Sequence, residues 1–283
     1  MRTVIQSGRF YFWPIIAANV VSITVAVKGD AITAVGLSVV ISCLASAGFL
    51  LNDLWDRKID LVNQAGHFEN SDRATIKRGI VSGLMLLLGG LIFAYYLGPL
   101  VLCIALGLAT ALLAYTVVLR KLLLIPTTIA AVVAASPLWA PLMVWRDNTD
   151  GWKWLFVIAN ILILAARELF MDARDQLGDM AGNRDTLATV FGRRITKTAA
   201  LILSFAGSAL FLGVVIADFF RLTATWGFAA LSVAGAVIYL VLQPAVVTLG
   251  SVTEERTAIQ RYVYRSRAAM ALMPVVNLML WRF

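Results

Sequence analysis

Two short stretches of the sequence carry aspartates at the same spacing. The positions are i, i+3 and i+7 in each case, occupied by Asp53, Asp56 and Asp60 and again by Asp172, Asp175 and Asp179. On a helix such positions lie within an arc of about 60°, so each stretch would present three carboxylates on one face. Stacked carboxylates repel one another, and the carboxyl-terminal end of a helix disfavours anions. Charged residues that merely leave the lipid would explain polar segments, but they do not explain this stacking.

The stacked carboxylates indicate a bound divalent cation. Mg²⁺ takes oxygen ligands and is typically held by one or two carboxylates, several waters and the phosphates of a substrate. With lysines and arginines nearby, the two clusters therefore fit a diphosphate that Mg²⁺ bridges to the protein. The sequence has no His/Cys set for zinc, because His67 is the only histidine, and we expect His67 to be a solvated loop residue. It also has no P-loop, dinucleotide-binding fingerprint or Ser-His-Asp triad.

The composition predicts that these clusters belong to a multi-pass membrane protein. Of the 283 residues, 60% are hydrophobic and 14% are charged, and the mean hydropathy is +0.85. Soluble domains have about 45–50% apolar and about 25% charged residues. A single water-facing core could not bury so much apolar surface, which excludes soluble and disordered chains. Cys43 and Cys103 both lie in apolar runs and are expected to pack there without forming a disulfide.

Apolar runs are numerous enough for about nine membrane-spanning helices, since a bilayer core of ~30 Å requires about 20 apolar residues per helix. Uncharged runs cover residues 10–27, 31–51, 80–119, 122–145, 198–217, 222–253 and 268–281, and a further apolar run, 154–171, carries Arg167 and Glu168 near its end. The 80–119 run is long enough for two helices, with a turn at Gly98-Pro99. We therefore expect residues 1–283 to form one all-α transmembrane domain, a helix bundle with a central cavity.

The distribution of basic residues orients this bundle. With the amino terminus in the cytoplasm, most of the 24 Lys and Arg residues fall on the cytoplasmic side, as the positive-inside rule requires. The long polar segments 52–79, 172–197 and 254–267 are expected on that side too, so the cavity should open there. The formal net charge of +8 then reflects loops that face the anionic lipids of a prokaryotic cell membrane, and no nucleic acid partner is expected.

The aspartate motifs resemble those of a known family. The strings Asn52-Asp53-x-x-Asp56-x-x-x-Asp60 and Asp175-x-x-x-Asp179 are similar to the two aspartate-rich motifs of the UbiA superfamily of intramembrane prenyltransferases. Residues 167–179 resemble the branch that includes geranylgeranylglyceryl phosphate synthases. Other stretches that resemble family elements are Tyr115 followed by Arg120-Lys121, and Thr186-Leu187.

The sequence departs from the family pattern after the first motif. The family usually has a short string of the type Asn-Arg-Pro-x-Pro-x-Gly at this place. Here Asn63 is followed by a longer segment, residues 64–78, that contains no proline. We expect Arg73 to take the place of the arginine in that string.

The resemblance implies Mg²⁺-dependent transfer of a prenyl group from a prenyl diphosphate to an aromatic or other lipophilic acceptor within the membrane. The residues that would bridge the metal to the diphosphate are Asn52, Asp56, Asp60, Asp175 and Asp179, of which the four aspartates would be catalytic. Asp53 and Asp172 would be further metal ligands or would orient the others. Additional positive charge for the diphosphate would come from Arg73, Arg120 and Lys121.

Two other functions remain open at this point. A terpene cyclase of the same superfamily would use the same metal site, but a double bond of the substrate itself would capture the carbocation; the unusual 64–78 segment leaves room for this outcome. A transporter would be expected to carry ionisable groups near the middle of the bilayer. In this sequence such groups cluster at the ends of the apolar runs, which favours an enzyme.

Overall fold

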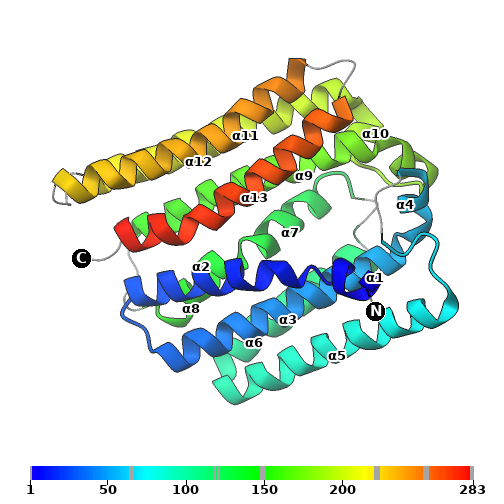
Figure 1. Cartoon of the computed structure of the whole chain (residues 1–283), viewed down its shortest axis with the longest axis horizontal. Helices are drawn as coiled ribbons and strands as arrows, with labels where there is room; N and C mark the ends of the chain where they lie inside the picture. Colours follow the sequence, from blue (N-terminus) through cyan, green and yellow to red (C-terminus); the bar gives the residue numbers. More distant parts are fainter. Residues whose placement is uncertain are drawn as a thin grey trace.

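The computed structural model describes residues 2–63, 67–117, 119, 122–146, 151–219, 224–250 and 255–280. These residues form a bundle of helices without strands (Figure 1), which confirms the all-α prediction. The helices are α1 (Arg2–Ser7), η1 (Phe10–Phe12, a 3₁₀ turn), α2 (Trp13–Ala26), α3 (Ala31–Trp55), α4 (Arg57–Asn63), α5 (Arg73–Leu97), α6 (Pro99–Val117), α7 (Ile125–Ala134), α8 (Ser136–Val144), α9 (Gly151–Ala181), α10 (Leu187–Phe191), α11 (Arg193–Phe219), α12 (Ala224–Gly250) and α13 (Glu255–Leu280).

Several of these helices are long and apolar enough to cross a membrane. Among the described residues these are α3, α5, α6, α9 and α11, and the bent pair of α7 and α8 counts as a sixth span. This confirms a multi-pass membrane protein. The predicted nine spans would also require α2, α12 and α13. The apolar parts described in α2 and α12 are shorter, Phe10–Ala26 and Ala229–Ala245, and α13 carries arginines in its first half.

Helix breaks follow from glycine and proline. The expected turn between α5 and α6 lies at Gly98, whose φ of 120° is a conformation that residues with a side chain rarely adopt. The 122–145 run, predicted as one helix, is instead bent by 64° between α7 and α8. The reason is Pro137 in the first turn of α8, because proline has no backbone N–H to continue the hydrogen bonds of the preceding helix.

Segments predicted as polar loops are largely helical. Helix α9 continues through Ala181 and therefore carries the second aspartate motif on its last turns. Helix α13 begins at Glu255, so the predicted 254–267 loop is also mostly helix. Both differences have one cause. A helix can continue past its last apolar residue when neighbouring helices pack against its polar turns. Helices α4, α10 and α11 pack against α9 in this way.

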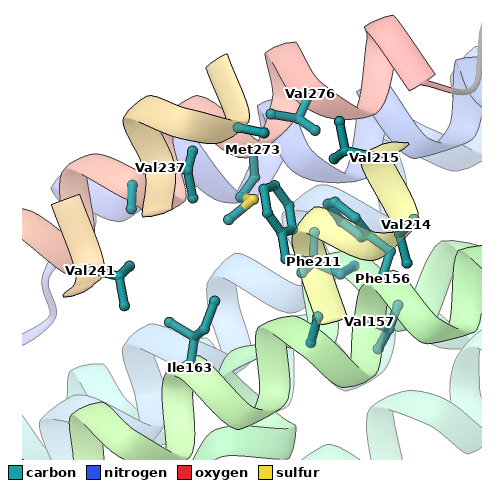
Figure 2. Packing of buried hydrophobic residues seen from close by; sticks show 14 of the residues in the cluster. Phe156, Val157, Ile163, Phe211, Val214, Val215, Val237, Val241, Met273 and Val276 are labelled. Carbon is teal, nitrogen blue, oxygen red and sulfur yellow. The ribbon is translucent and has the colours of Figure 1, made fainter. Parts of the chain in front are cut away.

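The apolar core consists mainly of two clusters. The larger one joins α9, α11, α12 and α13, and Figure 2 shows Phe156 of α9, Phe211 of α11 and Met273 of α13 meeting in it. The second cluster joins α2, α3, α6 and α8. The helix that leads into the first aspartate motif, α3, thus packs in one cluster, whereas α9 packs in the other. The two motifs can meet only where these two halves of the bundle touch.

Helices α9 and α11 approach so closely that one glycine is required between them. A Cβ atom at Gly207 would lie 2.8 Å from the carbonyl oxygen of Ala159 and 3.1 Å from the backbone nitrogen of Ile163. Both neighbours are backbone atoms of α9, which cannot move independently of their helix. By contrast, a Cβ atom at Gly213, farther along α11, would meet no atom within 4 Å.

We expect Gly207→Ala to lower the melting temperature of the purified protein, because overpacking a tight helix contact costs about 1–3 kcal/mol. Gly213→Ala is the matched control on the same helix. It should leave the melting temperature unchanged or raise it, since alanine has the higher helix propensity. The measurement is thermal unfolding of both variants in the same detergent. Equal melting temperatures would contradict the close contact.

The topology can be tested by cysteine labelling. After replacement of Cys43 and Cys103, single cysteines at Glu69 and Asp185 should react with a membrane-impermeant reagent from the same side of sealed vesicles. A cysteine at Gly151 should react from the opposite side, because α9 crosses the membrane between Gly151 and Ala181. Labelling of positions 69 and 185 from different sides would refute both the orientation and the shared site.

Candidate active site

The first aspartate motif lies across a helix break. Helix α3 ends at Trp55; Asp56 follows it and donates its N–H to the Asn52 carbonyl at 2.8 Å, and α4 begins at Arg57. The spacing predicted that the three aspartates share one face of a continuous helix. The break between α3 and α4 shows that they do not. Asp53 is buried and accepts hydrogen bonds from the Ser7 hydroxyl (2.9 Å) and from Arg9 (3.4 Å). Its carboxylate thus holds the amino-terminal segment against the end of α3.

The second motif lies on one uninterrupted helix, as predicted. Asp172 accepts a hydrogen bond from the Thr127 hydroxyl of α7 at 3.3 Å, and Asp175 is paired with Arg174 at 2.5 Å. Asp179 is buried at the end of α9. Figure 1 shows α4 and α10 at this same end of the bundle, which therefore contains both motifs.

Arg184 joins the two motifs. It lies in the loop between α9 and α10, and its guanidinium donates to Asp56 of the first motif and, at 3.3 Å, to Asp179 of the second. The loop is itself fixed, because the Arg184 N–H donates to the Asp179 carbonyl and the Thr189 hydroxyl donates to the Arg184 carbonyl, both at 2.9 Å. A cation thus occupies the point at which carboxylates from both motifs converge.

A second link lies directly beside this one. The N–H of Gly178 on α9 donates to the side-chain oxygen of the buried Asn63 at the end of α4, at 2.9 Å. A Cβ atom at Gly178 would lie 2.5 Å from that same oxygen. Only glycine allows α4 to approach α9 this closely, so Gly178 and Asn63 position the two motifs relative to each other.

The electrostatics of Asp60 show how crowded the carboxylates are. Partial burial, followed by the negative charges of Asp56, Asp53 and Asp175, raises the pKa of Asp60 to about 7. Carboxylates from both motifs therefore act on one another, as expected if they serve one site. A divalent cation would relieve this repulsion and favour the ionised form of Asp60.

The donor set fits Mg²⁺ but does not enclose it. In the part of the chain that the structure describes, no three His, Cys, Asp or Glu side chains are grouped closely enough to form a metal site by themselves. An ion between the motifs would bind a few carboxylate oxygens and take its other ligands from water and a substrate's phosphates, which is the typical environment of Mg²⁺. The position that Arg184 takes between Asp56 and Asp179 shows that a positive charge fits there.

The other predicted residues that the structure describes differ in how deeply they are buried. Asn52 is half-buried on the last turns of α3, and Arg73 is exposed at the start of α5. Arg120 and Lys121 lie outside the described residues. Tyr115, near the end of α6, lies close enough for the charges of Glu168 and Asp172 to act on it. His67 is exposed, as predicted.

Some residues that build the site were not predicted. By sequence alone, Arg184 counts only among the basic residues that orient the bundle. Its position five residues after Asp179 could have indicated an ion pair with the second motif. Ser7 and Thr127 could not be found, because they reach the aspartates from distant parts of the chain. Phe68 is fully buried, and a Cβ atom at Gly79 would lie 2.9 Å from its ring. This phenylalanine anchors the described part of the proline-free segment to α5.

Most of the chain matches a known protein family. The UbiA prenyltransferase family matches residues 11–254. The chain belongs to this family. The match confirms the family that the sequence resembles, and it covers α3, α4 and α9, on or next to which the two aspartate motifs lie.

Curated relatives of this UbiA family member are archaeal. A digeranylgeranylglyceryl phosphate synthase from Pyrococcus abyssi is 32% identical over 163 residues, which cover 57% of each chain. The enzyme of the same name from Methanospirillum hungatei is 29% identical over 191 residues, 62% of this chain and 68% of that one. The matched region thus spans little more than half of the Pyrococcus relative.

Solved structures share the fold over nearly the whole chain. A structure of digeranylgeranylglyceryl phosphate synthase has a TM-score of 0.67 at 16% identity and covers 99% of this chain and 98% of its own. A UbiA homologue from Archaeoglobus fulgidus bound to GPP and Mg²⁺ has a TM-score of 0.69 at 13% identity and covers 98% and 99%. At this identity the likeness establishes the fold alone.

The Arg184 bridge can be tested without substrate. Arg184→Gln should lower the melting temperature of the metal-free protein, because it removes the guanidinium that the buried carboxylates of Asp56 and Asp179 share, and breaking a buried ion pair costs about 3–5 kcal/mol. Added Mg²⁺ should then raise the melting temperature of the variant more than that of the unaltered protein, since the ion no longer competes with the guanidinium.

Arg194→Gln is the control for this experiment, because Arg194 is exposed at the start of α11. It should behave like the unaltered protein with EDTA and with Mg²⁺. An equal response to Mg²⁺ in the Arg184 variant would show that ion and guanidinium do not share the carboxylates.

Proposed function

We propose that this chain is a Mg²⁺-dependent prenyltransferase that transfers a prenyl group from a prenyl diphosphate to a lipophilic acceptor within the membrane. The observation that carries the proposal is the convergence of the two aspartate motifs on one cation position, now taken by Arg184. Membership of the UbiA prenyltransferase family supports it. The structure of a family homologue bound to GPP and Mg²⁺ supports the choice of donor and metal.

The residues divide the work on the donor. Asp56 and Asp60 on one side, and Asp175 and Asp179 on the other, would hold Mg²⁺, with Asn52 as a further oxygen ligand and Asp53 and Asp172 as ligands or orienting groups. When bound, Mg²⁺ neutralises the negative charge that accumulates on the departing diphosphate. Arg73, Arg120 and Lys121 are proposed to bind the diphosphate oxygens as well, and Arg184 can join them once it is released from the carboxylates.

The proposed reaction breaks one bond and forms another. The allylic C–O bond of the donor breaks, and its electron pair leaves with the diphosphate. The resulting carbocation accepts an electron pair from the acceptor, and the acceptor loses a proton to water or to a nearby base. The apolar surroundings exclude competing water, which would otherwise capture the carbocation.

The names of the relatives support one class of acceptor. Their name, digeranylgeranylglyceryl phosphate synthase, describes a product in which a glyceryl phosphate carries two geranylgeranyl groups. We propose the same class here: an alcohol that bears a phosphate and one prenyl chain, rather than an aromatic ring. Transfer to such an alcohol forms an ether. We place the active site on the cytoplasmic side, where the polar ends of α3 and α9 are expected.

Removal of one carboxylate from either motif should abolish transfer. We expect Asp56→Asn and Asp175→Asn each to lower kcat/KM for geranylgeranyl diphosphate by at least ~100-fold, about 2.7 kcal/mol of transition-state stabilisation. EDTA should inactivate the unaltered protein, and Mg²⁺ should restore only that protein. Asp185→Asn is the control, because Asp185 is exposed in the same loop.

Near-normal turnover in both variants would remove the aspartates from the donor site. Incubation with geranylgeranyl diphosphate alone tests the remaining alternative. A terpene cyclase would form a hydrocarbon or terpene alcohol without an acceptor, whereas a transferase should form product only when geranylgeranylglyceryl phosphate is added.

A further inference from the structure

Arg267 on α13 is a half-buried cation with no counter-ion. In the described part of the chain it makes no hydrogen bond or ion pair, and its Nε is buried without a partner. Aromatic rings surround it instead: its guanidinium carbon lies 5.4 Å from the ring centre of Phe12, 5.5 Å from that of Tyr264 and 6.0 Å from that of Tyr11. The guanidinium thus lies between α13 and the 3₁₀ turn η1.

Two more arginines lie near it. The charges of Arg167 on α9 and of Arg9, just before η1, both act on Arg267. Each of these two has its own carboxylate, since Arg167 pairs with Glu168 at 3.0 Å and Arg9 with Asp53 at 3.4 Å. The third guanidinium therefore leaves a positive charge in excess. The Nε of Arg167 is also buried without a hydrogen-bond partner.

Such an arrangement is unfavourable unless an anion completes it. Contacts with aromatic rings offset part of the cost of removing a guanidinium from water. They do not satisfy its N–H groups, and a buried cation is normally paired. The two unpaired Nε groups and the excess charge together indicate a site for an anionic group.

We infer that Arg267, with Arg167, binds the phosphate of the acceptor and thereby selects glyceryl phosphates over uncharged alcohols. The inference rests on the proposed function and deepens it, because it assigns the acceptor's anionic group to residues apart from the aspartate motifs. Arg267 lies beyond residues 11–254, the part of the chain that matches the family.

The distance to the aspartate site suits this role. Arg167 lies eight residues before Asp175 on α9, which is about 12 Å along the helix axis. Between them, Glu168 lies close enough for its charge to act on Asp172. An acceptor whose phosphate contacts Arg167 and Arg267 could therefore place its free hydroxyl, only a few bonds away, beside the carbon that leaves the diphosphate.

The test compares acceptors with and without phosphate. The full-length protein, in phosphatidylcholine nanodiscs, is given geranylgeranyl diphosphate and either geranylgeranylglyceryl phosphate or geranylgeranylglycerol. The unaltered protein should prefer the phosphate form. Arg267→Gln should raise KM for the phosphate form by at least ~10-fold, as expected for loss of a charge-assisted hydrogen bond, and should leave KM for the uncharged form and for the donor unchanged.

Matched variants separate binding from a structural effect. Arg265→Gln removes the same charge two residues away, where the guanidinium donates to Gln243 of α12 instead, and should leave the acceptor preference intact. Arg267→Lys keeps the charge and should retain part of the preference. If Arg267→Gln does not fold, Arg267→Lys and Arg167→Gln decide, because both must weaken the preference for the phosphate form.

Direct binding of the two acceptors distinguishes this inference from the proposed function. If the unaltered protein binds geranylgeranylglyceryl phosphate but transfers nothing to it, the proposed function fails and the anion site stands. If it transfers equally well to both acceptors, or if Arg267→Gln raises KM for the donor instead, the anion site is overturned.

Nanodiscs that contain phosphatidylglycerol test whether the anion comes from the bilayer. If this lipid competes with the acceptor, and if the Arg267→Gln variant keeps the same acceptor preference as the unaltered protein, Arg267 binds lipid headgroups and the inference is overturned.

Discussion

Repulsion between carboxylates is the constraint on which the rest of the site depends. Two helices from different halves of the bundle bring aspartates to one point, and burial there makes their mutual repulsion stronger than it would be in water. Arg184 is the cation that makes this arrangement stable in the absence of a metal, because it contacts Asp56 and Asp179 at once. The carboxylates are thereby held near the geometry that a metal and a diphosphate would require.

Close backbone contacts keep this geometry when the cation changes. Gly178 lets α4 approach α9, and Gly207 lets α11 approach α9 from another side. Neither contact depends on a charge, so neither is weakened when Arg184 leaves the carboxylates. The bundle therefore separates two tasks: apolar packing and glycine contacts fix the positions of the helices, whereas the charged residues at their ends remain free to exchange partners.

The charged residues on and beside α9 differ in whether they have a partner within the protein. Asp172, Asp175 and Arg174 have partners within the protein, and Arg167 is paired with Glu168 on its own helix. Within the described residues Arg267, on α13, has no carboxylate partner, and its guanidinium lies against aromatic rings. The proposed donor site, with Asp175, and the proposed anion site, with Arg167, thus include residues of the same helix, α9, which suits a reaction that brings a diphosphate and a phosphate-bearing alcohol together.

The sequence by itself determined the class of the protein and the chemistry of its motifs. Composition predicted a membrane helix bundle, because the length of each apolar run can be compared directly with the thickness of the bilayer. The spacing of the aspartates predicted their clustering. Only the tertiary structure decided how the motifs meet. The Asn63–Gly178 contact, the ion pair of Arg184 with Asp56 and the position of Arg267 beside Phe12 all depend on residues far apart in the chain. Local spacing carries no information about such pairs, because their contacts exist only after the helices have packed.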